Sequence, residues 1–502
     1  MNEQNFIKVI QEKIEKFKEK IKVEKTGVVL KVGDGIAQIY GLKEAKMSEL
    51  LIFPHNIQGM VLNLEEEIVG AAIFGDDSLI KEGYEVKLTG RILEVPVGEE
   101  LLGRVIDPLG KPLDGGASIS AKKMHPIEVK APGIAQREPV NTPLMTGIKA
   151  IDAMIPIGRG QRELVIGDRQ TGKTALLIDT ILNQKGKDVY CFYVAIGQKN
   201  STVATVIDAL KKYDCLSYTT IVVANASSPT PLQYIAPYAA TSMAEYFRDR
   251  EEDALVIYDD LTKHAACYRE LSLLLRRPPG REAYPGDIFY THSRLLERAC
   301  KLNKHHGGGS LTALPVIETQ AQDVTTYIPT NLISITDGQI YLDTDLFHQG
   351  MRPAINVGLS VSRVGGTAQF KAIKEISGML RLELAQFREV EAFTQLGTEL
   401  DKETKFQIER GRRLVEILKQ PQFKPFSLAE QVLVIYTATR GFLDDIPIKE
   451  IRRFEEEFLE FVHQNYEYVL RKIEEDKDFD EKDEERFKEI INEFKKKFIY
   501  VE

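Results

Sequence analysis

Apolar residues follow three different patterns along the chain, and each pattern predicts a different architecture. In residues 25–96 they form short β-rich runs separated by glycine turns, which is typical of a small β-barrel. In residues 97–370 nearly continuous apolar runs alternate with helical segments, as in a mainly parallel sheet covered on both faces. In residues 371–502 the helical period dominates, and we expect an α-helical domain there.

Individual strands can be proposed in the first two segments from these runs. In the barrel segment they are residues 27–32, 36–40, 60–64 and 68–74. In the central segment they are residues 164–166, 189–196, 220–224, 254–258 and 311–317.

Residues 1–24 precede the barrel and predict a charged amphipathic helix. Its apolar residues recur at three- and four-residue steps on one face: Phe6, Ile10, Ile14, Phe17 and Ile21. The face can pack on its own domain or dock onto a partner helix, and the pattern alone leaves both open.

The last thirty residues are highly charged but keep an apolar face. Phe487, Ile490, Ile491 and Phe494 recur at helical spacing among the charges. We therefore expect a terminal pair of solvated helices and not a disordered tail.

Composition narrows the class of protein. A chain of 502 residues is too long for one core and predicts two to four domains. The net charge of −9 argues against a nucleic-acid partner, which would favour a basic face. Four cysteines without a Cys-x-x-Cys pair predict reduced core residues, and the histidines show no metal-ligand spacing. We expect no membrane span, and the first residues resemble neither a secretory signal nor a transit peptide.

One octapeptide carries the clearest chemistry, and it fits the phosphate-binding loop G-x-x-x-x-G-K-[ST]. Its residues are Gly167, Asp168, Arg169, Gln170, Thr171, Gly172, Lys173 and Thr174. The glycines let backbone N–H groups point at a polyphosphate, and the following helix adds its positive end. Lys173 can contact the β- and γ-phosphates, and the Thr174 hydroxyl can ligate Mg²⁺. An apolar run before the loop and a helical run after it give the expected setting, so we predict ATP or ADP with Mg²⁺.

Two further positions complete the predicted site. Asp259 directly ends the apolar run 254–258 and can reach Mg²⁺, directly or through water. Gln198 follows the run 189–196, where a group that orients or deprotonates the attacking water is expected. An amide cannot take a proton near neutral pH. The sequence therefore predicts a site that holds nucleotide better than it cleaves it.

At this point the chain resembles the alpha subunits of the F-type ATP synthases over nearly all of its length. The segments that carry the resemblance are residues 33–37, 96–105, 167–174, 273–287, 329–339 and 352–363. The Asp-Arg-Gln-Thr filling of the loop and the Gly-Gln-Lys around Gln198 are similar to alpha subunits, and the lack of a transit peptide fits a bacterial source. The catalytic beta subunits have a loop rich in small residues and Gly-Glu-Arg instead.

The resemblance implies a fold and a division of labour. Its members have an N-terminal β-barrel, a central RecA-like α/β P-loop domain and a C-terminal helical domain. Alpha and beta subunits alternate in a six-membered ring around the gamma shaft of a proton-translocating ATP synthase. The alpha site holds Mg-ATP tightly and turns it over little or not at all. An arginine of alpha, Arg363 by motif match, reaches the catalytic site of the adjacent beta subunit.

The resemblance also implies contacts for the base and for other subunits. Phe347, Arg352 and Pro353 match the stretch that packs on adenine, and Gln420 and Gln422 match two glutamines of the helical domain. The loop 278–286 is expected to face the shaft. The N-terminal helix is expected to dock onto the delta subunit of the peripheral stalk. The complex would lie at the cytoplasmic face of a bacterial membrane, which this chain would touch only indirectly.

Other members of the broader class offer alternative interpretations. An autonomous hexameric ATPase, of the export or helicase type, should carry a carboxylate where Gln198 stands, and a helicase should also have a basic barrel. A vacuolar-type B subunit has usually lost the phosphate loop, which this chain keeps. These comparisons favour the non-catalytic alpha-type subunit.

Overall fold

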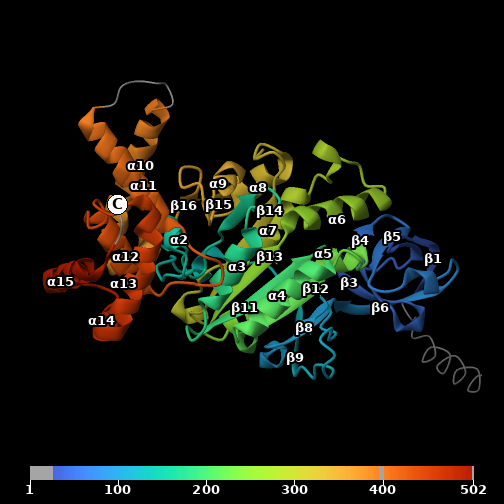
Figure 1. Cartoon of the computed structure of the whole chain (residues 1–502). Helices are drawn as coiled ribbons and strands as arrows, with labels where there is room; N and C mark the ends of the chain where they lie inside the picture. Colours follow the sequence, from blue (N-terminus) through green and yellow to red (C-terminus); the bar gives the residue numbers. More distant parts are fainter. Residues whose placement is uncertain (1–25, 395–400, 500–502) are drawn as a thin grey trace, which may run out of the picture.

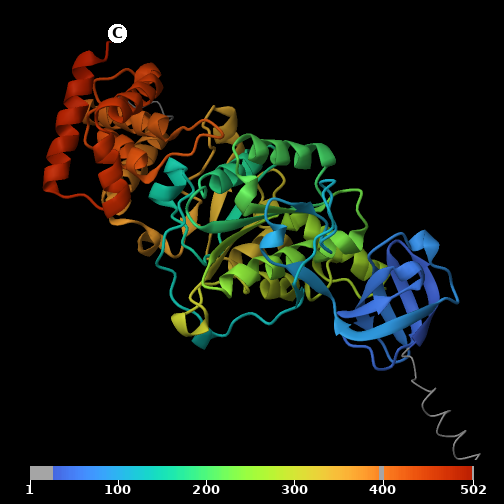
Figure 2. The same cartoon turned by 90° about the horizontal axis from the view of Figure 1, so that it is seen from below.

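The computed structural model describes residues 26–394 and 401–499, which form three bodies in a row. A small barrel lies at one end, an α/β domain in the middle and a group of helices at the other end (Figures 1 and 2). The helix expected in residues 1–24 lies outside the described residues. The fold class predicted from the patterns of apolar residues, a β-barrel followed by an α/β domain and a helical domain, is confirmed.

The N-terminal body is a closed, six-stranded antiparallel barrel. Its strands are β1 (Thr26–Gly33), β2 (Ile36–Gly41), β3 (Glu49–Ile52), β4 (Gln58–Leu64), β5 (Ile68–Ile73) and β6 (Glu85–Ile92). They run in the order β1-β2-β5-β4-β3-β6 around the barrel. Alternate residues such as Val29, Ile39 and Val61 fill the interior, as the two-residue period of a strand requires.

The central body is built on one eight-stranded sheet. In sheet order its strands are β16 (Val361–Ser362), β15 (Gly338–Leu342), β10 (Leu164–Gly167), β14 (Ser310–Glu318), β13 (Asp253–Asp259), β11 (Val189–Ile196), β12 (Thr219–Ala224) and β8 (Val105–Ile106). Every neighbouring pair is parallel except β15 with β16. All five strands predicted for this domain are present. A separate antiparallel pair, β7 (Glu94–Val97) with β9 (Lys123–Pro126), lies near the barrel.

Helices cover both faces of this sheet, which explains the continuous apolar runs. One face packs on α2 (Lys149–Met154), α3 (Lys173–Leu182) and α4 (Asn200–Lys212). The other packs on α5 (Thr230–Arg248), α6 (Leu261–Leu274), α7 (Ile288–Leu296) and α8 (Tyr327–Ile335). A strand buried on both sides has no polar face, so its sequence loses the alternation seen in the barrel.

Strand register gathers the carboxyl ends of the central strands at one edge. Gly167 lies beside Glu318, and Ala195 lies beside Asp259. Parallel strands present their carboxyl ends on the same side, where ligands bind in open α/β sheets. The phosphate loop after β10 and the acid that ends β13 therefore meet at this edge.

The C-terminal body consists of helices that share a core with the central domain. They are α10 (Lys371–Thr394), α11 (Lys402–Leu418), α12 (Leu428–Thr439), α13 (Ile451–Asn465), α14 (Glu467–Asp476) and α15 (Glu481–Lys497). The predicted terminal pair is confirmed as α14 and α15, and the four apolar residues of α15 are buried. A fully buried ion pair between Lys149 of α2 and Glu455 of α13 joins the two bodies.

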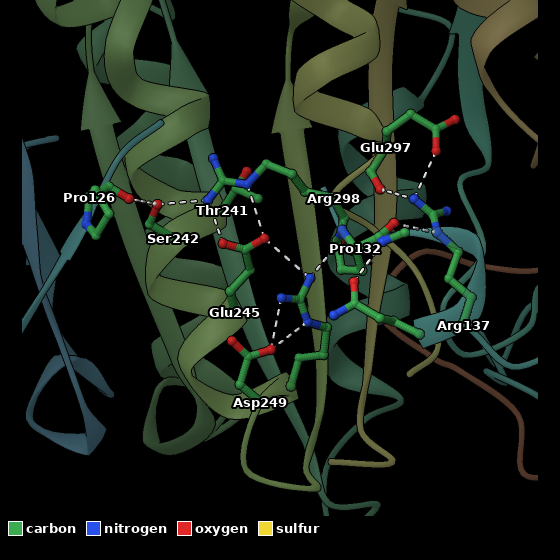
Figure 3. A network of polar contacts seen from close by, with 12 residues as sticks. Pro126, Pro132, Arg137, Thr241, Ser242, Glu245, Asp249, Glu297 and Arg298 are labelled. Carbon is green, nitrogen blue, oxygen red and sulfur yellow. Dashed lines mark hydrogen bonds and ion pairs between the residues drawn. The ribbon is translucent and has the colours of Figure 1, made fainter. Parts of the chain in front are cut away.

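In the central domain, a network of buried charged and polar residues links α5 to Arg298, which follows α7 (Figure 3). Arg298 is 1% exposed and donates to both carboxylate oxygens of Glu245 on α5. It also donates 2.7 Å hydrogen bonds to the carbonyl of Ile127 and to the Ser242 hydroxyl. Burial raises the pKa of Glu245, but Arg298 and Arg248 outweigh it and hold that pKa below its ordinary value. Each of the buried ions Arg298, Arg248 and Glu245 thus has a counter-charge, as buried ions require.

The four cysteines are free and buried, as the sequence predicted. None of the helices in the described part of the chain is long and apolar enough to cross a bilayer.

Candidate nucleotide-binding site

The phosphate loop joins β10 to α3 through a backbone that only certain residues tolerate. Gly172 has φ +99° at the N-cap of α3, and Gln170 has φ +64°. Glycine adopts such angles at little cost. Gly167 is restricted for a different reason: a Cβ there would lie 2.7 Å from the carbonyl oxygen of Leu342, so the position has no room for a side chain. The loop therefore turns tightly and leads straight into the helix N-terminus, where N–H groups favour an anion.

Lys173 folds over the loop that precedes it. Its Nζ donates hydrogen bonds to the backbone carbonyls of Gly167, at 2.6 Å, and Asp168. Burial lowers the pKa of Lys173, while the negative charges of Glu318, Asp260 and Asp259 oppose that shift. The ammonium is thus held at the loop mouth, within reach of a phosphate bound there.

The other loop side chains have separate tasks. Asp168 accepts from the Thr319 hydroxyl at 2.6 Å and from the Gln322 backbone, so it anchors the loop to the segment after β14. Thr171 donates to the Asp168 carbonyl at 2.9 Å and stabilises the turn. Arg169 is exposed and pairs with Glu318 at 3.0 Å.

The carboxylate of Asp259 lies on the side of the site where the sequence predicts Mg²⁺. Its Oδ2 lies 3.5 Å from the Thr174 hydroxyl and accepts a 2.5 Å hydrogen bond from the Tyr193 hydroxyl. Its Oδ1 accepts a 2.7 Å hydrogen bond from the Gln198 amide. Burial raises the pKa of Asp259, whereas its hydrogen-bond donors and two lysines stabilise the charged form. Asp260 has a different role, because it caps α6 by accepting from Lys263 N.

This oxygen set fits Mg²⁺. Magnesium prefers hard oxygen ligands and is usually bound by one or two protein groups together with water and substrate phosphates. A hydroxyl and a carboxylate at the loop mouth supply those groups. Among the described residues no cluster of three or more His, Cys, Asp or Glu offers an all-protein metal cage.

An apolar pocket continues from the loop toward the helical domain. It is lined by Ile148, Thr171, Gly172, Ala175, Leu176, Asp179, Phe347, Arg352, Pro353, Ala354, Gln420, Pro421 and Gln422. The Arg352 guanidinium lies 4.9 Å from the Phe347 ring centre. This platform of an aromatic ring, a stacked guanidinium and a proline suits a flat base, and the phosphate loop forms its near end.

The two glutamines line this pocket in different ways. Gln420 is buried, and both of its N–H groups are used by the carbonyls of Gly147 and Lys424, at 2.8 and 3.0 Å. Its carbonyl oxygen accepts from Lys149 N. Gln420 therefore shapes the wall and leaves little hydrogen-bonding capacity for a ligand. Gln422 is exposed at the rim.

Two site residues escaped the sequence reasoning. Tyr193 lies within an apolar strand run and reads as core, yet its hydroxyl holds Asp259. Asp179 lies on α3 in the base pocket and accepts a 2.7 Å hydrogen bond from Phe423 N of the helical domain. Burial raises the pKa of Asp179 to about 7. The sequence did offer a signal for Asp179, because a carboxylate inside an apolar helical run indicates a buried acid with a specific role. It offered none for Tyr193, because tyrosine is common in buried strands.

Arg363 lies apart from the nucleotide pocket. It follows the short edge strand β16, and its backbone N–H donates to the Asp337 carbonyl at 2.8 Å. Its side chain is exposed and makes no hydrogen bond or ion pair with another residue in the described part of the chain. The geometry thus brings together the loop, Gln198, Asp259 and the base pocket, and leaves Arg363 at the surface.

Comparison with known protein families agrees with this architecture domain by domain. Residues 22–90 match the beta-barrel domain of the ATP synthase alpha/beta family, and residues 147–362 match its nucleotide-binding domain. Residues 369–494 match the C-terminal domain of the ATP synthase alpha/beta chain. These matches follow one another in the order of the three bodies. The chain therefore belongs to the ATP synthase alpha/beta family.

Proposed function

We propose that this chain is the alpha-type, non-catalytic member of an F-type ATP synthase ring, which binds Mg-ATP and does not hydrolyse it. The observation that carries the proposal is the side chain of residue 198. Hydrolysis needs a group that orients or deprotonates water near the γ-phosphate. Here that position holds an amide, and the amide already donates to Asp259.

Binding at this site follows from parts that this chain supplies itself. Loop N–H groups and Lys173 would hold the phosphates, and the apolar pocket would hold adenine. Thr174 and Asp259 would hold Mg²⁺, which neutralises phosphate charge when bound. Tyr193 and Gln198 fix the orientation of the Asp259 carboxylate, so the binding geometry is set in advance.

The second part of the proposal concerns Arg363. An exposed guanidinium on a firmly held backbone suits a role in a neighbouring subunit, where it would contact charge on the transferred phosphoryl group. Arginines that act in this way raise rates by about 10³–10⁵ in GTPases. We propose a beta subunit as that neighbour, alternating with this chain in the ring.

The remaining partners follow from the same assignment. The loop 278–286 is closed by a 2.7 Å hydrogen bond from Gly280 N to the Tyr284 carbonyl, and its side chains at 281–283 are exposed. A stiff, exposed loop suits a bearing surface against the gamma shaft. The peripheral stalk would bind the N-terminal segment. The assembly would lie at the cytoplasmic face of a bacterial membrane and carry protons through its membrane part.

The test is ATP hydrolysis by the purified chain, alone and with its beta subunit. We expect the isolated chain to bind Mg-ATP with negligible turnover, and turnover to appear only in the mixed assembly. Arg363→Ala should then remove most of that activity. Vigorous hydrolysis by the chain alone would support the competing function, an autonomous hexameric ATPase of the export or helicase type.

A further inference from the structure

Asp179 is a carboxylate of the base pocket with one oxygen unused. It lies on α3 and is only 6% exposed. Its Oδ1 accepts the 2.7 Å hydrogen bond from Phe423 N, and its Oδ2 accepts no hydrogen bond in the described part of the chain. The side chain borders the pocket, and its free oxygen is not sealed in the core. An acceptor at a nearly buried, apolar wall costs free energy until a donor pairs with it.

Asp179 lies at the end of the pocket away from the phosphates. One face of α3 lines the pocket, through Gly172, Ala175, Leu176 and Asp179. A helix rises about 1.5 Å per residue, which puts Asp179 about 7.5 Å along the axis from Thr174, at the phosphate and Mg²⁺ end. A nucleotide whose phosphates occupy the loop therefore brings its base to the level of Asp179.

The other polar side chains near the base offer less acceptor capacity. Gln420 uses both N–H groups and its carbonyl oxygen in hydrogen bonds to backbone groups. The Arg352 guanidinium only donates, and it stacks on an aromatic ring. Gln422 is exposed at the rim, where water competes for its amide. Asp179 is therefore the buried side chain that presents a free acceptor at the base end of the pocket.

The protonation state of Asp179 does not remove this acceptor. Burial raises the pKa of the carboxyl to about 7, and the Phe423 N–H opposes that rise. An ionised carboxylate is an acceptor only, and a protonated carboxyl keeps acceptor lone pairs beside its O–H. A ligand N–H can therefore pair with Asp179 in either state, and the hydrogen bond is stronger with the charged form.

Purine bases differ at the position that would meet this oxygen. Carbon 6 lies on the side of the base away from the ribose. In adenine it carries an amino group, which donates, whereas in guanine it carries an oxygen, which accepts. A 6-oxo group would set one acceptor against another and leave the carboxylate without a donor. A site built to hydrogen-bond an N–H group rejects analogues that lack it more strongly than an apolar pocket does.

We propose that Asp179 is a specificity-determining residue: its free oxygen accepts a hydrogen bond from the 6-amino group of adenine and selects adenine over 6-oxopurines. This recognition deepens the Mg-ATP binding proposed above and rests on it. The Phe423 N–H holds the other oxygen, so the carboxylate meets the base in a fixed orientation.

The test measures the binding of three magnesium nucleotides to the full chain by titration calorimetry at pH 8, where the charged form of Asp179 predominates. The nucleotides are ATP, with a 6-amino group, purine riboside triphosphate, with hydrogen at that position, and ITP, with an oxygen. The variants are Asp179→Ala, Asp179→Asn and Asp77→Asn. Asp77 is the matched control, because its carboxylate also accepts a backbone N–H, from Gly35 at 2.9 Å, but lies beside the barrel strands.

For the unmodified chain we expect ATP to bind at least about tenfold more tightly than purine riboside triphosphate, and ITP to bind most weakly. Asp179→Ala should bring the affinities for ATP and purine riboside triphosphate within twofold of each other. Asp179→Asn keeps an oxygen for Phe423 N and turns its amide N–H groups toward the base, so ITP should now bind more tightly than ATP. Asp77→Asn should reproduce the unmodified affinities. If Asp179→Ala does not fold, the reversal in Asp179→Asn decides.

The outcomes separate base recognition from the proposed function. If the unmodified chain does not bind Mg-ATP, both fail. If it binds the three nucleotides equally, only the recognition of adenine fails. The same holds if Asp179→Ala weakens all three by one factor, because the acid then acts on the fold through Phe423. A preference for ATP that survives Asp179→Asn would likewise overturn the role of this carboxylate.

Discussion

The Gln198 amide donates a 2.7 Å hydrogen bond to the Asp259 carboxylate, and this contact links the two sides of the nucleotide site. Asp259 faces Thr174 on the metal side, and Gln198 stands where the attacking water would be oriented. The amide therefore supports the metal-side acid and supplies no base. The proposed binding without cleavage would follow from this one side-chain identity.

Replacing Gln198 by Glu should add a group that can accept a proton from water. We expect Gln198→Glu to raise ATP hydrolysis by the isolated chain at least about tenfold, below the 10²–10⁴ typical of a well-placed general base. The gain in hydrolysis is limited because the isolated chain has no neighbouring subunit to supply an arginine. Steady-state phosphate release measures it. Gln198→Ala is the control and should stay at the background rate; equal rates for the two variants would contradict the assignment.

Removing the charge of Lys173 should weaken nucleotide binding. Hydrogen bonds to charged groups contribute about 1.5–3 kcal/mol, so Lys173→Ala should lower Mg-ATP affinity about 10- to 150-fold. Titration calorimetry at fixed Mg²⁺ measures the change. Lys185→Ala is the matched control, because Lys185 is an exposed lysine that pairs with Asp214 at 3.1 Å beyond α3. An affinity loss below twofold for Lys173→Ala would place the phosphates elsewhere.

The sequence predicted those features of this molecule that depend on a local pattern of residues. The phosphate loop is contiguous, and an acid at the end of an apolar run marks Asp259 without any tertiary knowledge. The fold class follows in the same way, because barrel, sheet and helices have different apolar periods. Gln198 was found because the end of a predicted parallel strand has a predictable location.

The residues that were missed act through contacts between distant segments. Asp179 and its donor Phe423 are 244 positions apart, and Tyr193 contacts Asp259 on the neighbouring strand. Periodicity assigns a residue to a face but does not specify its neighbour on the next element.

The buried network around Glu245 should be important for stability. Neutralising the Glu245 carboxylate leaves Arg298 and Arg248 buried without the counter-ion that they share. Breaking a buried ion pair costs about 3–5 kcal/mol. We expect Glu245→Gln to lower the free energy of unfolding by that amount in urea titrations. Glu467→Gln is the control: Glu467 pairs with Arg471 at 2.7 Å on the surface, where a pair contributes at most about 1 kcal/mol. Equal losses for the two variants would contradict this view.

A buried histidine pair should make the fold sensitive to acid. His264 Nε2 lies 2.9 Å from the Tyr234 carbonyl and must donate to it, so His264 Nδ1 accepts from His292 Nε2 at 3.2 Å. His292 Nδ1 then remains buried without a partner among the described residues. Burial lowers the pKa of His264 from 6.5 to about 4, and burial, followed by His264, lowers that of His292 well below its ordinary value.

The sign of the effect follows from proton binding in the two states. Below pH 6.5 His264 binds a proton in the unfolded chain but stays neutral in the folded chain. The free energy of unfolding therefore falls as the pH drops from about 6.5 to about 4. At 1.36 kcal/mol per unit, His264 alone accounts for about 3 kcal/mol over that range. His264→Gln keeps a donor and an acceptor but cannot be protonated. Urea titrations at pH 7, 6 and 5 should therefore give this variant a shallower loss of stability than the unmodified chain, and parallel pH profiles would show that the pair does not govern acid sensitivity.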